Sequence, residues 1–268
     1  NYVGKVALAA VGASTPIINM LIGFFMGIST GAGVVIAQFF GAGNTCKMKR
    51  AIHNSIALTL VMGVVLTIVG LFFNDPILKA IGVPSEVFSE ASTYLSIYFW
   101  SLIFVMVYNM GSGILRSVGD SKRPLYFLIF SSVVNIILDF LFVKYFHFGV
   151  AGAGYATLIA QAISAIMVMY VLMKTEDDYK VILKEIGFDK EILLKIIKIG
   201  LPTGFQQSIV SLSNVIVQSY INVYGASVIA GYSVTIKIDG FVNLPLQAFN
   251  MAITTFVGQN IGAKQYDR

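Results

Sequence analysis

Seven stretches of this chain are apolar over about 20 residues or more, the length that an α-helix needs to cross a ~30 Å hydrocarbon layer. In chain order they are Pro16–Phe40, Ile52–Phe73, Ala91–Leu115, Leu125–Phe146, Ala151–Met173, Ile199–Val223 and Val228–Val257. Hydrophobic residues make up 57% of the chain, charged residues only 12%, and the mean hydropathy is +0.82. Because lipid cannot satisfy backbone polar groups, these windows predict an all-α integral membrane protein, built as a polytopic helix bundle.

The basic residues are distributed unevenly over the loops between these windows. Alternate loops hold 14 of the 18 Lys and Arg residues, namely Lys47, Lys49, Arg50, Arg116, Lys122, Arg123, the six lysines from Lys174 to Lys198, Lys264 and Arg268. The positive-inside rule places these loops in the cytoplasm. We therefore predict a multi-pass protein of the cell inner (plasma) membrane, with residue 1 outside and residue 268 cytoplasmic. The basic loops account for orientation, so the net charge of +5 gives little support for an acidic partner, and we expect no nucleic-acid partner.

The sequence gives no support for an enzyme or a metal site. Cys46 is the single cysteine and cannot form an intrachain disulfide. His53 and His147 are far apart, with no cysteine or carboxylate at metal-ligand spacing, and no nucleophile–base constellation is evident. We predict no catalytic residues and no bound metal. No cleavable signal peptide is evident in the sequence, which begins without Met, so we interpret it as a fragment.

Two segments of the chain match without gaps at an offset of 221 residues. Asn1, Gly4, Ala9, Gln38, Gly41 and Ala42 correspond to Asn222, Gly225, Ala230, Gln259, Gly262 and Ala263. The two spans have the same predicted direction, which indicates a parallel repeat about an axis along the membrane normal. We expect an N-lobe in residues 1–173, a cytoplasmic inter-lobe linker in residues 174–198, and the start of a truncated C-lobe in residues 199–268.

Two local features bear on how these parts are joined. Gly27 and Gly31 have the spacing of a close contact between helices. Asp189, near the end of the charged linker, can cap the helix that continues into the sixth window.

Asp139 is a carboxylate inside an apolar window, where an ionised side chain costs roughly 2.5–3.5 kcal/mol at the bilayer centre. Asn135 lies one helical turn earlier and shares its face. Their oxygens suit Na⁺, and a desolvated carboxyl suits a proton. The pair is predicted to be a cation or proton site, with Asn109 and Thr157 on nearby spans as further oxygen ligands. A structural polar pair that bridges helices is the alternative.

Other polar residues are candidates for a substrate cavity. Lys237 and Asp239 lie within the last window but do not share a helical face, so at least one is expected to point into water. Charge compensation near the outer interface is the alternative explanation. Gln206, Gln207 and Asn214 on the preceding span are candidates for the same cavity.

Five motifs resemble the multidrug and toxic compound extrusion (MATE) family. Ala9–Gly12 together with AQFFGAGN at residues 37–44 is similar to its second helix, and GILRSVGDSKRP at 113–124 to its loop between helices four and five. Asn135–Asp139 and GVAGAGYAT at 149–157 resemble helices five and six, and VGQNIGA at 257–263 the end of helix eight. The resemblance covers essentially the whole chain.

The resemblance implies a fold of twelve helices in two six-helix lobes, of which this chain would hold helices two to eight. It implies a coupling-ion site at Asp139, Asn135, Asn109 and Thr157, whose acidic residue on helix one lies outside this sequence. The implied function is a monomeric secondary active antiporter that exports small amphipathic or cationic drugs in exchange for Na⁺ or H⁺, with no other cofactor.

Three alternatives stay open. A lipid-linked oligosaccharide flippase of the same superfamily would need a basic central cavity, and Lys237 is the one basic candidate for it. A seven-helix receptor would show no parallel repeat. A membrane enzyme would need a catalytic constellation, and none is evident.

Overall fold

The computed structural model describes residues 4–222 and 226–268, apart from some side chains near the ends of α1, α6 and α7 and within α7. These residues form seven α-helices: α1 (Gly4–Gly41), α2 (Thr45–Ala80), α3 (Ser85–Ser117), α4 (Lys122–Phe140), α5 (Gly149–Lys174), α6 (Lys190–Asn222) and α7 (Ala226–Gly262). A π-helical turn, η1 (Leu141–Tyr145), extends α4, and a 3₁₀ turn, η2 (Leu183–Glu185), lies before α6. Each predicted window corresponds to one helix.

Within the described residues, five segments are long and apolar enough to cross a membrane. They are Ile17–Gly41, Thr45–Ala80, Ser85–Ser117, Lys122–Tyr145 and Gly149–Lys174. The helices α6 and α7 are not among them, so membrane spans at these two positions stay predictions.

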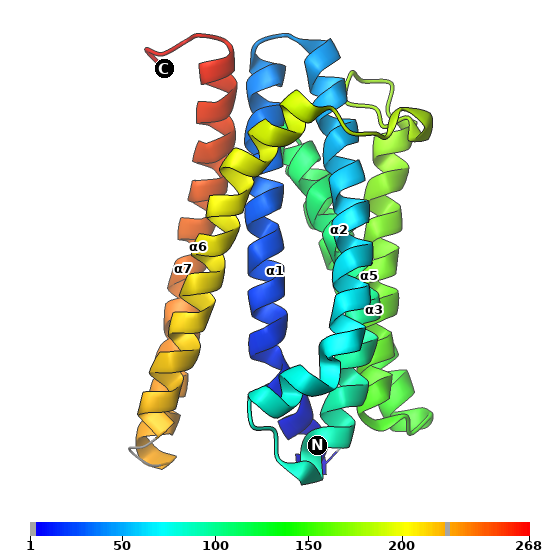
Figure 1. Cartoon of the computed structure of the whole chain (residues 1–268), viewed down its shortest axis with the longest axis vertical. Coiled ribbons are helices and arrows are strands. Elements are labelled where there is room, and N and C mark those ends of the chain that lie inside the picture. The colour runs from blue at the N-terminus through cyan, green and yellow to red at the C-terminus, as the bar shows by residue number, and fades with distance from the viewer. Residues whose placement is uncertain (1–3, 223–225) are drawn as a thin grey trace.

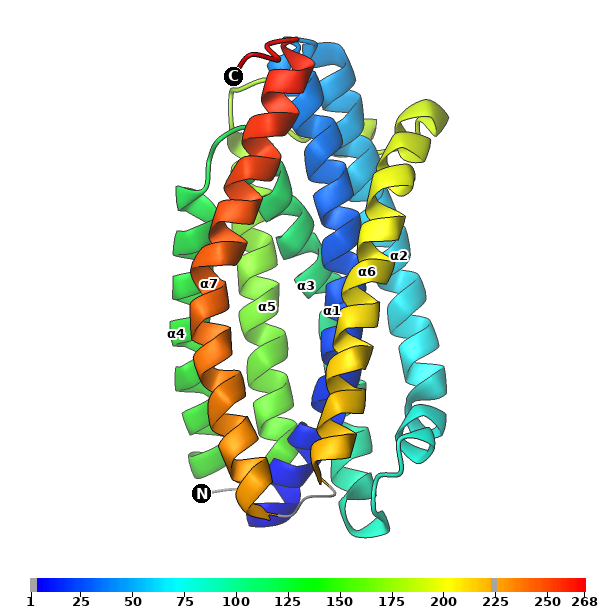
Figure 2. The same ribbon diagram turned by 90° about the vertical axis from the view of Figure 1, so that its left-hand side faces the viewer.

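Successive helices run in alternate directions, so α1 and α7 run the same way through the molecule (Figure 1). This agrees with the parallel repeat predicted from the sequence. The loops after α1, α3 and α5 and the segment after α7 all lie at one end (Figures 1 and 2). We call it the basic end, because it carries the predicted cytoplasmic Lys and Arg residues.

The helix α3 lies at the centre of the packing, against α1, α2 and α5. One cluster of buried side chains, which includes Ile52, Met110 and Leu172, fills the half toward the basic end. A second cluster around Leu95 and Phe99 fills the other half. By contrast, α2 and α4 present large apolar side chains on the outside, as a helix in contact with lipid requires.

Glycines bring α1 and α6 into backbone contact. A Cβ atom at Gly27 would overlap the backbone of Gly204, and one at Gly31 would overlap the backbone of Gly200. The close contact predicted at Gly27 and Gly31 is confirmed, and its partners are the glycines on either side of Pro202 in α6.

A second glycine contact joins α1 to α7 at the basic end. A Cβ at Gly41 would overlap the carbonyl oxygen of Gln259, and a Cβ at Gly262 would overlap the carbonyl oxygen of Gln38. The contact is reciprocal, since the glycine of each helix meets the glutamine of the other. Gln38 and Gly41 are also the positions that the repeat matches with Gln259 and Gly262. The matches at the other end of the repeat involve Asn1 and Gly225, which lie outside the described residues.

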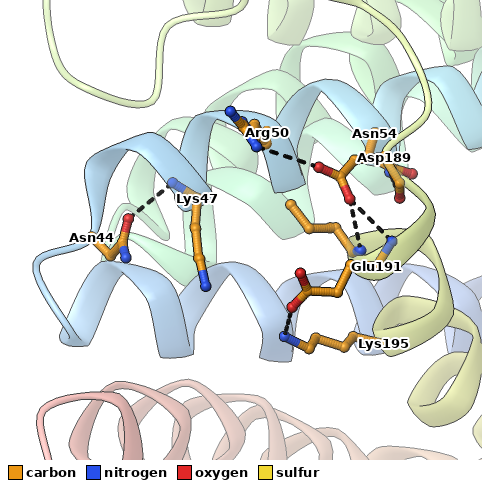
Figure 3. A network of polar contacts seen from close by, with 8 residues as sticks. Asn44, Lys47, Arg50, Asn54, Asp189, Glu191 and Lys195 are labelled. Carbon is orange, nitrogen blue, oxygen red and sulfur yellow. Dashed lines mark hydrogen bonds and ion pairs between the residues drawn. The ribbon is translucent and has the colours of Figure 1, made fainter.

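The segment between α5 and α6 is fastened to the start of α2 (Figure 3). Asp189 Oδ1 accepts hydrogen bonds from the backbone amides of Glu191 (3.0 Å) and Ile192 (3.2 Å), which makes it the predicted cap. Asn54 Nδ2 donates to the Asp189 carbonyl (2.7 Å), and Arg50 lies 3.7 Å from its carboxylate. The helix α6 therefore begins at Lys190, inside the range predicted as linker.

One further contact fixes the same region, and an ion pair lies within the start of α6. The buried imidazole of His53 accepts a hydrogen bond at Nε2 from the backbone amide of Ile182 (2.9 Å). A hydrogen bond from Lys195, together with its positive charge, lowers the pKa of the exposed Glu191 carboxyl. The linker is therefore held by α2 and by the first turn of α6.

Candidate functional site

A cavity of about 470 Å³ lies between α1, α3, α6 and α7. Figure 2 shows α6 and α7 in front of α1 and α3 around this region. Five amide side chains line it, namely Asn109, Gln206, Gln207, Gln247 and Asn250. Hydroxyl groups and glycines of α1 and α3 supply much of the remaining wall. A cavity of this size and polarity can hold a drug-sized molecule.

Arg116, in the last turn of α3, is the one charged side chain among the described residues that line the cavity. It is partly buried, and it forms no ion pair or hydrogen bond with any residue that the structure describes. No acidic and no aromatic side chain is present among those lining residues. The charge that the described residues contribute to the cavity is therefore positive.

The structure places two of the predicted cavity residues, Gln206 and Gln207, on this wall. Asn214 and Asp239 are exposed and lie outside the lining. The side chain of Lys237 falls outside the described residues. Asn214 and Asp239 lie on parts of α6 and α7 that extend beyond the cavity, so neither side chain lines it.

Asp139 and Asn135 lie on one face of α4, in the part of the span away from the basic end. Both residues are half-buried. Asp139 Oδ1 and Asn135 Nδ2 are buried atoms with no hydrogen-bond partner among the residues that the structure describes. Since buried polar atoms normally have partners, the pair is a place where a ligand can bind. The π-helical turn η1 begins two residues after Asp139, and such turns are frequent at functional sites.

The other two predicted ion ligands are placed differently. Thr157 is on α5, beside α4, and its hydroxyl donates to the carbonyl of Ala153 (3.0 Å). Asn109 is on α3, where Nδ2 donates to the carbonyl of Val105 (2.8 Å), and it lines the inter-lobe cavity. In the described structure no hydrogen bond links either residue to Asp139. A single site formed by all four residues stays a prediction.

Two residues near these sites were missed by sequence reasoning. Tyr94 of α3 lies within electrostatic range of Asp139. Arg116 was counted among the basic loop residues, although it belongs to the last helical turn and faces the cavity. One sequence signal could have indicated that Arg116 is helical. It directly follows the apolar run of the third window, and the glycine that ends the helix, Gly119, comes three residues later.

Comparisons with known proteins agree with the sequence resemblance. The model of the family described as MatE matches residues 1–141 and 202–268. The chain is 33% identical over 274 residues to the probable multidrug resistance protein YoeA of Bacillus subtilis (strain 168), a match that covers 100% of this chain and 59% of YoeA. It is 29% identical over 262 residues to the probable multidrug resistance protein YpnP of the same organism, covering 98% and 58%.

Solved structures show the same similarity. A MOP superfamily transporter from Pyrococcus furiosus superposes with a TM-score of 0.90 at 28% identity, covering 97% of this chain and 58% of that one. An outward-facing multidrug resistance MATE family transporter superposes with a TM-score of 0.89, with the same identity and coverage. The chain thus spans somewhat under two thirds of the length of these relatives. It belongs to the MatE family, a family of membrane transporters and not of enzymes.

Proposed function

We propose that the full-length protein is a secondary active efflux antiporter. It exports small amphipathic compounds or organic cations in exchange for Na⁺ or H⁺, as a monomer in the plasma membrane with residue 1 outside. The observation that carries this proposal is the separation of two polar sites within one bundle. The Asp139–Asn135 pair, with two buried atoms that no described residue satisfies, lies on α4, while the cavity lies between α1, α3, α6 and α7. Two separate polar sites suit an antiporter, because one can bind the ion and the other the substrate.

The coupling works through a change in the packing of the two lobes. Na⁺ or H⁺ from outside binds at Asp139, which lies in the outer part of α4 under the predicted orientation. The ion shifts the conformational equilibrium only as far as its affinity differs between the two states. The contacts of α1 with α6 and α7 are the surfaces across which the lobes meet, so they must change when the cavity opens to the other side.

A flippase is the less favoured alternative. Such a protein must accommodate an anionic lipid-linked headgroup in a basic central cavity. Arg116 is the single basic side chain among the described lining residues, and about 470 Å³ fits a drug-sized compound better than an oligosaccharide.

The test is Asp139→Asn in the full-length protein, reconstituted in vesicles with imposed Na⁺ and H⁺ gradients. The amide keeps the size of the side chain but removes its charge and its capacity to take up a proton. We expect ion-driven drug efflux to fall more than about tenfold, which corresponds to ~1.4 kcal/mol of lost coupling. Asp267→Asn, a change at an exposed aspartate near the end of the chain, is the matched control and should leave efflux unchanged. Unaltered coupling in Asp139→Asn would contradict the site.

A further inference from the structure

We infer that Arg116 forms an anion subsite in the inter-lobe cavity, which binds the carboxylate of an amphipathic acid or zwitterion. The inference rests on the proposed export function and names a substrate class for the same cavity. It depends on three properties of the described wall: an unpaired guanidinium, amide groups without partners, and the absence of groups that recognise cations.

The first property is the charge of Arg116. A partly buried charge without a counter-charge is unfavourable, because it loses hydration and gains no partner. Tyr108 lies in electrostatic range of Arg116, and its hydroxyl already donates to the carbonyl of Pro124 (2.9 Å). The neighbouring carboxylate of Asp120 pairs instead with Arg123, at 3.3 Å. The guanidinium fork is thus available, and a carboxylate matches its geometry with two parallel hydrogen bonds.

The second property is the set of amide side chains on the opposite wall. Gln206 and Gln207 of α6 and Gln247 and Asn250 of α7 line the cavity. Their side-chain amides form no hydrogen bond with any described residue. Amides both donate and accept, so they can bind the polar atoms around a carboxylate or the rest of a polar ligand. They add adaptable hydrogen bonding without adding charge.

The third property concerns what the wall lacks. An organic cation is recognised by a carboxylate or by the face of an aromatic ring. Neither is present among the described lining residues, and the guanidinium of Arg116 repels a cation that enters beside it. The wall therefore favours a ligand that carries at least one negative group at the Arg116 end.

The subsite also lies next to the contact that closes the basic end. The carbonyl of Ser117, adjacent to Arg116, accepts a hydrogen bond from Gln259 Nε2 (2.8 Å), and the Ser117 hydroxyl donates to the carbonyl of Gly33 (2.9 Å). A carboxylate bound at Arg116 is therefore held beside the junction of α1, α3 and α7.

The experiment measures binding to purified full-length protein by fluorescence anisotropy. The probes are a zwitterionic rhodamine acid and its cationic methyl ester, which differ at the carboxylate alone. We expect wild type to prefer the acid. Arg116→Gln should weaken binding of the acid by roughly tenfold to a hundredfold, as expected for a hydrogen bond to a charged group. Binding of the ester should stay the same or become tighter, because the variant no longer repels its positive charge. Arg116→Lys, which keeps the charge but not the fork, should give an intermediate loss.

Arg123→Gln removes one positive charge at an exposed position outside the cavity and should leave the acid-to-ester ratio at the wild-type value. The inference is overturned if wild type binds both probes equally, or if Arg116→Gln weakens both to the same extent. It is also overturned if Arg123→Gln lowers the ratio as much. Should Arg116→Gln fail to fold, Arg116→Lys decides, and an unchanged ratio in that variant contradicts the subsite. Efflux of the same probes reports separately on the proposed function, since the acid could bind through Arg116 without being exported.

Discussion

At the scale of single residues, glycines decide how closely α1 approaches its neighbours. The positions face different surroundings although they share one side of the helix. Gly27 and Gly31 meet the backbone of α6, whereas a Cβ at Gly23 would lie 3.5 Å from the Cβ of Gln207, an ordinary contact. The side-chain volume tolerated at each glycine therefore differs along a single helical stripe.

This difference predicts unequal effects of the same substitution. Gly31→Ala places a methyl group against the backbone of Gly200, which cannot move without displacing α6. We expect a loss of about 1–3 kcal/mol of stability, as for overpacking of a close-packed interior. Gly23→Ala is the control: its methyl group makes an ordinary contact, so stability should not fall and should rise by roughly 0.5–1 kcal/mol, because alanine favours the helix over glycine. Thermal unfolding of the full-length protein in detergent compares the two, and equal melting temperatures would contradict the contact.

Residues also show where sequence reasoning succeeds and where it stops. Asp139 could be recognised from sequence, since one carboxylate in an apolar window is costly whatever surrounds it. Arg116 could not be recognised as a cavity residue from sequence. The positive-inside rule counts it among the residues that set membrane orientation, and that rule does not say which way a side chain at a helix end points. Asn214 and Asp239 show the same limit, since a polar residue within a span can face the outside as well as a cavity.

At the scale of elements, the start of α6 depends on a side chain that also contacts α2. Asp189 caps α6 through Oδ1, pairs with Arg50 through Oδ2, and accepts from Asn54 through its backbone. The cap was foreseeable, because an aspartate before a run of helix-forming residues is a common start signal. Its attachment to α2, 135 positions away in sequence, was not, since nothing local specifies that partner.

Two substitutions separate the cap from the ion pair. Asp189→Ala removes both and should cost about 1 kcal/mol at the N-terminus of α6, whereas Asp189→Asn keeps an acceptor for the helix amides. The ion pair with Arg50 is largely exposed and contributes little. Hydrogen exchange at Glu191 and Ile192 should speed up about fivefold in Asp189→Ala and much less in Asp189→Asn.

Asp178→Ala serves as the control for this comparison. Its carboxylate pairs with Lys49 at 3.4 Å on the same face of the molecule, and the side chain caps no helix. Exchange at the start of α6 should therefore stay at the wild-type rate. Equally fast exchange in Asp189→Asn and Asp189→Ala would show that the cap does not stabilise the helix.

At the scale of the whole molecule, equivalent positions of the repeat on α1 and α7 lie in contact with each other. Offset matches in sequence indicated equivalent helices, and the parallel course of α1 and α7 agrees with them (Figure 1). The sequence could not show that the matched Gln–Gly pairs would contact each other. Matching positions indicate that two helices have equivalent places in the two repeats, but not that they lie side by side. Their reciprocal contact places the relation between α1 and α7 at the basic end, where Gln259 also reaches Ser117 of α3.

This contact predicts how the conformational equilibrium responds to added volume. Gly41→Ala and Gly262→Ala each place a methyl group where a carbonyl oxygen lies in the closed arrangement, so both should favour separation of α1 and α7. Overpacking of about 1 kcal/mol or more would raise the open population about fivefold. Spin labels on the exposed Cys46 and on an exposed Gln265→Cys position, in full-length protein without other cysteines, measure this separation.

Gly240→Ala, whose Cβ would meet nothing within 4 Å, is the control and should keep the wild-type distance distribution. Because the contact is reciprocal, a shift to longer distances in only one of the two glycine variants would contradict it as clearly as no shift in either.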